Sequence, residues 1–120
     1  MKIKNIQILL ANQAIEELIK LKLPLKVMTN YKLAQISSLI RNQSSIVEAT
    51  KDQLIVKHGE NGTMTPSSKN FPAFFLEWNE ISDMEIDLDV PERIKLEELS
   101  GDNINIPINL LRDLLPFIYR

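Results

Sequence analysis

The sequence predicts an α+β fold: a long, coiled-coil-like helical hairpin with a small antiparallel sheet and short C-terminal helices. Two patterns lead to this prediction. The stretch from Val27 to Lys57 contains neither proline nor glycine, and its apolar residues recur at helical spacing. Residues Met84 to Val90 alternate apolar and acidic side chains instead, as in a strand with one buried face. A hydrophobic fraction of 44% over 120 residues supplies enough apolar side chains for one core of ordinary size.

We expect a single domain over residues 1–120. Residues 1–58 form the helical hairpin, residues 59–70 a polar loop, and residues 71–120 a short helix, the small sheet and a closing helix. The chain has no cysteine, which excludes a disulfide framework and a sulfur-based zinc site and fits a reducing compartment. Glu16 and Glu17 interrupt the apolar residues near the N-terminus, so we expect neither an export signal nor a membrane span, and a cytoplasmic location.

The first helix is expected to begin after Asn5, a favourable N-cap residue, and to run to about Leu21. Its apolar stripe has spacings of three and four residues and consists of Ile8, Ala11, Ile15 and Leu18. Pro24 then ends the pattern in a turn, because proline lacks an amide hydrogen and disfavours helix at the residue before it.

The second helix carries a heptad seam. Positions 29, 33, 36, 40, 43, 47, 50 and 54 alternate in steps of four and three along a helix of roughly 45 Å. We expect the first helix to cover the beginning of this seam, and another segment or a second copy of the chain to cover the rest. The expected self-association seam consists of Leu33, Ile36, Ile40, Val47 and Leu54. Gly59 is expected to end the helix in the left-handed conformation.

A surface loop should follow, because residues 58–70 combine two glycines and a proline with small polar residues. Asn70 then suits the N-cap of a short helix. Its aromatic and apolar side chains fall at helical spacing, and we expect them to pack in the core: Phe71, Phe74, Phe75, Trp78 and Ile81.

The C-terminal third is expected to hold the small sheet and the closing helix. Residues 84–90 form the clearest strand, and residues 94–96 and 104–106 repeat its alternation briefly. Pro107 suits the first turn of the final helix, and Pro116 should kink or end it.

The sequence contains no recognisable catalytic motif. His58 is the only histidine, and it lies at a helix end where a basic side chain already has a structural reason. A single histidine without cysteine offers few ways to assemble a nucleophile, a base and an orienting group. Gly59 to Gly62 follows a helix and lacks the lysine and hydroxyl of a phosphate-binding loop. We therefore expect no enzyme activity, and no catalytic, cofactor-binding or metal-binding residue.

Charge is distributed unevenly along the chain. Residues 1–58 hold nine Lys/Arg and four Asp/Glu, a net +5, whereas residues 59–120 hold five and twelve, a net −7, which together give the total of −2. The acidic strand has three possible roles: a solvated face that prevents edge-to-edge aggregation, a mimic of nucleic-acid phosphates, or a weak divalent-ion site. The side chains expected to contact a protein partner are Glu85, Asp87 and Asp89 on the strand and Glu60 and Asn61 at the loop tip.

Direct nucleic-acid binding is disfavoured. The lysines nearest one another, around the Pro24 turn, have no aromatic residues interleaved with them, and the sequence pI is about 5.4.

Several segments together resemble a family of small phage-encoded proteins of unknown function from Gram-positive hosts. They are MKIKN at the start, LKLPLKV after the first helix, LIVKHGENG at the end of the second, then MEIDLDV, IKLEEL and IPINLL. The resemblance spans nearly the whole chain and carries no catalytic residues. It implies a phage or prophage gene that acts in virion assembly or on a host protein.

Two binding functions are therefore expected. The first is an assembly accessory that forms a homo-oligomer through the seam and docks on a virion component, which would make it virion-associated. The second is a host-directed inhibitor, for example of a defence or nucleic-acid enzyme, that uses the acidic strand face. The oligomeric state distinguishes these two functions, since only the first requires a stable homo-oligomer.

Overall fold

The computed structural model describes residues 1–120 as a mostly helical α+β protein. In chain order the elements are β1 (Lys2–Lys4), α1 (Asn5–Lys20), α2 (Val27–His58), α3 (Phe71–Asp83), β2 (Glu85–Asp87), β3 (Ile94–Lys95), the 3₁₀ helix η1 (Leu96–Leu99), α4 (Ile108–Leu114), the 3₁₀ helix η2 (Leu115–Phe117) and β4 (Ile118–Tyr119). The predicted fold class, including the pairing of the first two helices, is confirmed.

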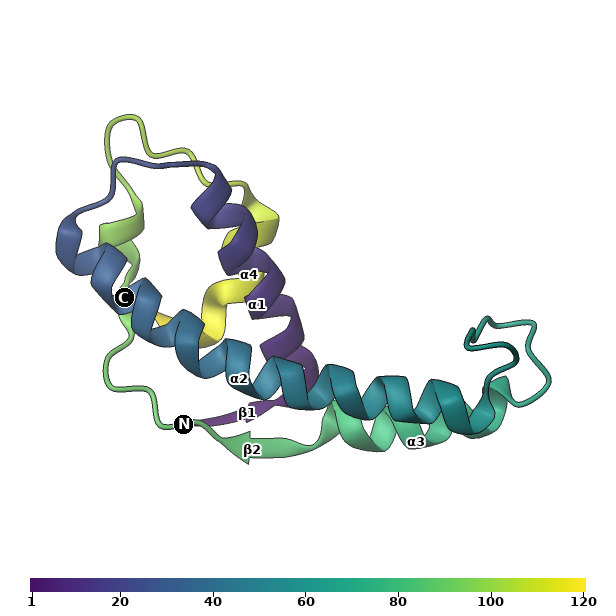
Figure 1. The fold of residues 1–120 in the computed structure, drawn as a ribbon. Helices are drawn as coiled ribbons and strands as arrows, with labels where there is room; N and C mark the ends of the chain where they lie inside the picture. The colour runs from purple at the N-terminus through teal and green to yellow at the C-terminus, as the bar shows by residue number, and fades with distance from the viewer.

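The molecule has a body and an arm (Figure 1). In the body, α1 crosses the first half of α2, and the C-terminal segments lie beside both helices. The arm, residues 46–83, consists of the second half of α2, the following loop and α3, which runs back along α2. The arm makes the molecule long, with extents of 52 × 27 × 19 Å.

The core lies in the body and comes from three parts of the chain. The stripe predicted on α1 is buried, as are Leu33, Ile36 and Ile40 of α2. The third part is the C-terminal segment, with Leu110 of α4 and Phe117 of η2 among its buried residues. Each such side chain contributes about 1.5–3 kcal/mol on burial. The core therefore depends on contacts between residues distant in sequence.

The heptad seam of α2 is its buried face. Thr29, Leu33, Ile36, Ile40 and Val47 are buried, and Gln43, Thr50 and Leu54 are half-buried. α1 covers the first part and α3 the remainder. The seam expected to bind a second copy is therefore already occupied within the chain. A homo-oligomer would have to use another surface.

Asn5 does not cap α1, although its residue type suggested that role. The N-cap is Lys4, whose backbone amide donates to Gln7 Oε1 at 3.0 Å. The Asn5 side chain is buried instead, donates through Nδ2 to the carbonyl of Ile81 at 2.9 Å, and accepts at Oδ1 from Gln43 Nε2 at 3.1 Å. Asn5 thus connects the start of α1 to both α2 and α3.

The strands expected to form one small antiparallel sheet pair instead in two separate two-stranded sheets. β1 pairs antiparallel with β2, so the strand predicted at 84–90 forms only where the three residues of β1 lie beside it. β3 pairs in parallel with β4 at the C-terminus. Residues 104–106 pair with no other segment and form no strand; left-handed backbone at Asn103 (φ 64°) and Gly101 (φ 137°) turns the chain just before them. The N-terminal strand could not be recognised, because three residues are too few to show a pattern.

Gly59 ends α2 in extended rather than left-handed backbone, with φ −80° and ψ 171°. Glycine is needed there for space, because a Cβ would contact the carbonyl oxygens of Ile55 and Thr63. The left-handed residues are Asn61 (φ 53°) and Gly62 (φ 75°). They form a two-residue turn of the type preferred in hairpins, closed by hydrogen bonds of 3.0 Å in both directions between Glu60 and Thr63.

The aromatic stripe of α3 is only partly core. Phe74 is 6% exposed, whereas Phe75 is 49% exposed and stacks on Phe71 with ring centroids 5.6 Å apart. Along the arm α3 packs on α2, and only its C-terminal end also meets the start of α1, so one side of α3 remains in solvent.

Candidate functional site

The acidic strand face, the first expected binding site, lies beside basic groups. In the β1–β2 register Lys2 stands opposite Asp87 and Lys4 opposite Glu85. The amino group of Met1 lies 2.8 Å from Asp87 Oδ1. This hydrogen bond, followed by the attraction of the same amino group and of Lys2, lowers the pKa of Asp87. Asp87 is therefore engaged within the chain, and the local field is less negative than the acidic sequence suggested.

The remaining expected contacts are spread over the molecule. Asp89 is exposed just beyond β2. Glu60 and Asn61 are also exposed, but they form the turn at the far end of the arm, away from β2 (Figure 1). The structure therefore brings Glu85, Asp87 and Asp89 to one region, and does not bring the loop tip to them.

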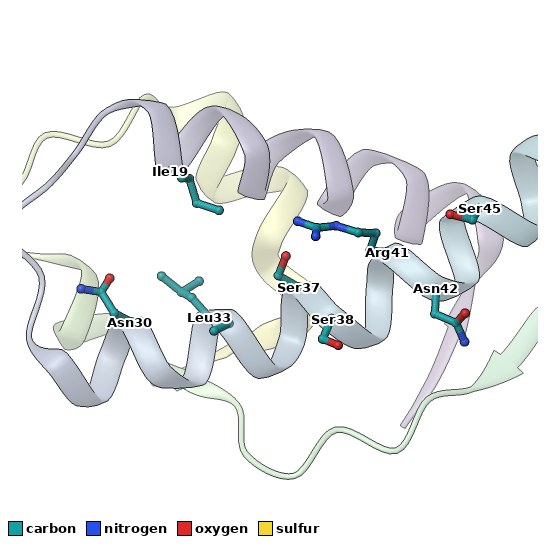
Figure 2. Close-up of a pocket in the computed structure, with 9 residues that line it drawn as sticks. Ile19, Asn30, Leu33, Ser37, Ser38, Arg41, Asn42 and Ser45 are labelled. Atoms are coloured by element: carbon teal, nitrogen blue, oxygen red, sulfur yellow. The ribbon is translucent and has the colours of Figure 1, made fainter.

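A groove between α1 and α2 is the largest hollow on the body, with a volume of about 710 Å³. Ile19 of α1 forms one wall, and α2 contributes Leu33, Ser37, Arg41 and Ser45, among other residues. Figure 2 shows the Arg41 side chain reaching from α2 toward α1, and the Ser37 hydroxyl directed into the same space. The groove thus combines aliphatic walls with hydroxyl groups and one cation.

The groove has no carboxylate to balance its charge. Arg41 forms no ion pair within the chain, unlike Lys32, Lys57 and Arg112. Ser37 is 7% exposed, and its hydroxyl has no hydrogen-bond partner within the chain. These free donors are the parts of the groove that a ligand could engage.

The outer side of α3 is a second unpartnered surface, on the arm. We define the outer arm face as Phe75, Leu76 and Glu80. Phe75 is 49% and Leu76 67% exposed, and Glu80 lies one helical turn after Leu76. The face is apolar with an acidic edge.

A charged cluster fixes the start of α2 to η1. Lys32 Nζ lies 3.1 Å from Glu98 Oε1 and 3.4 Å from Glu92 Oε1, and Thr29 also donates to Glu98. Hydrogen bonding to Glu98 raises the pKa of Lys32, against the opposing effect of desolvation. For Glu98 desolvation is the largest single effect and acts upward, but hydrogen bonds from the Lys95 amide, Lys32 and Thr29 together lower its pKa. The cluster is internally satisfied, so we assign it to the fold.

His58 also has a local partner. Its Nε2 lies 3.1 Å from Glu77 Oε2, and Lys57 Nζ lies 2.9 Å from Glu77 Oε1. Hydrogen bonds from Lys57 and then from His58 lower the pKa of Glu77. These contacts fasten the end of α2 to α3. No three His, Asp or Glu side chains gather where they could share a metal ion, and none of the helices is long and apolar enough to cross a bilayer.

Sequence reasoning identified neither the groove nor the outer arm face. A signal for the groove was present between Ser37 and Ser45, where three serines, one asparagine and one arginine fall on the side of α2 that lines it: Ser37, Ser38, Arg41, Asn42 and Ser45. Such small polar residues resemble any solvated helix face, and only the position of α1 turns them into a wall of the groove.

Comparison of the chain with family models, with curated proteins and with solved structures gave no match.

Proposed function

We propose that this chain is a non-catalytic, protein-binding accessory protein of phage or prophage assembly. It docks through the outer arm face on a component of the particle. The observation that carries the proposal is the arm itself: it extends away from the body, and α3 on it leaves two large apolar side chains in solvent.

The packing of α3 does not explain these side chains. Phe74 is turned toward α2, and Glu77 bonds to the end of α2, so the inner side of α3 is already satisfied. Phe75 and Leu76 take no part in that contact and remain exposed, although aromatic and aliphatic side chains gain most from burial. Neighbouring exposed apolar side chains on a rigid helix are typical of an interface core.

The chemistry of the face indicates what it binds. Glu80 borders the apolar pair and has no ion pair within the chain. The complementary surface is therefore apolar with a basic edge, which would orient the two proteins on encounter.

The acidic strand face supports the alternative, a host-directed inhibitor, less well. A phosphate mimic requires a row of unpaired carboxylates, whereas Asp87 is paired with the amino group of Met1 and has Lys2 opposite it. We therefore retain the assembly function, but as docking through the outer arm face and not through self-association, because α1 and α3 cover the seam on which a homo-oligomer was expected to form.

Site-specific photo-crosslinking tests the proposal. A photoreactive residue at position 76 should give a discrete adduct with a particle component in cells that produce the phage, and Leu76→Lys should abolish co-sedimentation of the chain with particles or assembly intermediates. Position 108 is the matched control, because Ile108 is 84% exposed and lies on the body. Equal crosslinking from both positions, unchanged co-sedimentation of Leu76→Lys, or an adduct with a host enzyme would contradict the proposal.

A further inference from the structure

We propose that the groove between α1 and α2 is a second binding site, which accepts an extended acidic segment of a protein partner. It lies on the body, apart from the outer arm face, and goes beyond the function proposed above. It can be tested without knowledge of the particle.

The groove contains two side chains that can donate hydrogen bonds to a ligand. The guanidinium of Arg41 and the hydroxyl of Ser37 lie one helical turn apart and are directed into the same space (Figure 2). Neither has a partner within the chain, and Ser37 is 7% exposed. The Ser37 hydroxyl opens into the groove, unlike the fully buried Ser44 hydroxyl, so a ligand can accept its hydrogen bond in place of water. A carboxylate would accept from Ser37 and from Arg41 together.

The charge along the groove is positive. A smaller hollow of about 200 Å³ continues it, sharing Ile19, Asn30 and Leu33 and adding Lys22. The residues that line the two hollows include Arg41 and Lys22 but no Asp or Glu. Two cations along adjoining hollows complement a ligand with more than one negative charge.

The open shape of the groove suits an extended ligand. Small-molecule sites enclose most of their ligand, whereas this groove lies open along two helices, and its wall residue Ile19 is itself 59% exposed. An extended polypeptide points successive side chains to opposite sides. A segment that carries both acidic and aliphatic residues can therefore offer carboxylates to Arg41 and Lys22 and aliphatic groups to Ile19 and Leu33.

Substitutions at Lys22 and Ser37 allow an effect on ligand binding to be distinguished from an effect on folding. The Lys22 backbone is left-handed, with φ 51°, directly after the end of α1, a position where glycine is the favoured residue. Lys22→Gly relieves this strain and also removes the ammonium group. Ser37→Ala similarly removes a hydroxyl that has no partner. Both variants should therefore fold at least as well as the parent chain and bind more weakly.

The experiment is a titration of the ¹⁵N-labelled full chain, followed by NMR, with the blocked hexapeptide Leu-Asp-Leu-Asp-Leu-Asp. We expect shifts concentrated at residues 19–22, 30–34 and 37–45, and a weaker interaction at high salt. The same peptide with asparagine for aspartate keeps the shape without the charge and should bind at least about tenfold more weakly, equivalent to one lost charge-assisted contact.

Variants then locate the contact. Arg41→Gln should weaken binding of the aspartate peptide about tenfold, and Lys22→Gly and Ser37→Ala severalfold, with no loss of thermal stability in the last two. Lys69→Gln is the matched control, because it removes an exposed cation from the arm loop and should leave binding unchanged.

Each contrary result overturns the proposal. No shifts in the groove, equal binding of the asparagine peptide, or unchanged binding by Arg41→Gln would exclude an acidic segment there. Inorganic phosphate that saturates the same shifts at the peptide's concentration would indicate a simple anion site. Groove shifts that depend on protein concentration without peptide would show that a second copy is the occupant. None of these results would affect crosslinking from the arm, so the two proposals fail independently.

Discussion

At the scale of single residues, buried polar groups decide how precisely the parts are joined. Asn5 satisfies a carbonyl at the end of α3 and an amide on α2, while its own backbone amide donates to the carbonyl of Met84 at 3.1 Å. Ser44 shows the contrasting situation, since its hydroxyl is fully buried and has no partner. A satisfied buried group specifies one arrangement, whereas an unsatisfied one only costs stability.

Asn5→Ala should therefore lower the free energy of unfolding by about 2 kcal/mol, because it leaves the Ile81 carbonyl and the Gln43 amide without their partner. The measurement is denaturant unfolding followed by circular dichroism. Asn12→Ala, a half-buried position on the same helix, is the control and should change stability by less than about 0.5 kcal/mol. Similar losses from both variants would show that the Asn5 bridge is unimportant.

The stability of the fold should depend on pH through Glu98. Its pKa is lower in the folded chain than in the unfolded chain, so its stabilising contribution is complete above the ordinary glutamate pKa and is lost as the pH falls through the folded value. The thermal midpoint of the parent chain should therefore fall between about pH 5 and pH 3, and that of Glu98→Gln should fall less steeply from a lower starting value. Glu97→Gln, the exposed neighbour, should follow the parent curve. Parallel slopes for all three would contradict the assignment.

At the scale of elements, the body and arm differ in how much each buries. The body buries residues from α1, α2 and the C-terminal segments around one core, whereas the arm has two helices joined mainly by Phe74, Val47 and half-buried neighbours. Elements with few buried contacts open more readily than the rest of a protein. The arm should therefore exchange its amide hydrogens faster than the first half of α2.

Phe74→Ala tests this division. Removing a buried phenylalanine typically costs about 3–5 kcal/mol, but here the loss should be felt mainly as detachment of α3. Hydrogen exchange should increase across residues 71–83 and the end of α2, while α1 keeps its protection. Phe75→Ala, at a half-exposed position of the same helix, should cost less than about 1 kcal/mol. Uniform loss of protection through the whole chain would mean that body and arm unfold together.

At the scale of the whole molecule, the arm dominates the shape. The radius of gyration is 16.7 Å, against about 14 Å for a compact domain of this length. The excess follows from α2, because a 32-residue helix is longer than the body that it crosses. An exposed arm on a small body suits attachment to something larger.

Light scattering coupled to small-angle X-ray scattering measures both properties. We expect a mass near 13.8 kDa at micromolar concentration, because the seam is covered by α1 and α3, and an elongated particle with a radius of gyration close to the 16.7 Å of the structure. A concentration-independent dimer would show that another surface mediates self-association. A compact particle would mean that the arm folds back on the body.

The sequence by itself determined the helices and their inward faces. The seam from Thr29 to Leu54 and the stripe from Ile8 to Leu18 could be predicted because helical periodicity is a local property. The proline turn, the polar loop and the acidic strand could be predicted for the same reason. Asn5, Gly59 and Phe75 were interpreted less well, because their roles depend on neighbours far along the chain.

Only the tertiary structure decided what covers each face. It placed the N-terminal strand beside Glu85 to Asp87, closed the seam with α3 instead of a second copy, and set α1 against α2 so that Arg41 and Ser37 share a groove. These are contacts between segments tens of residues apart, and nothing in a local pattern specifies them. The physical reason is that periodicity fixes which side chains avoid water, whereas the partners they meet are chosen by packing of the whole chain.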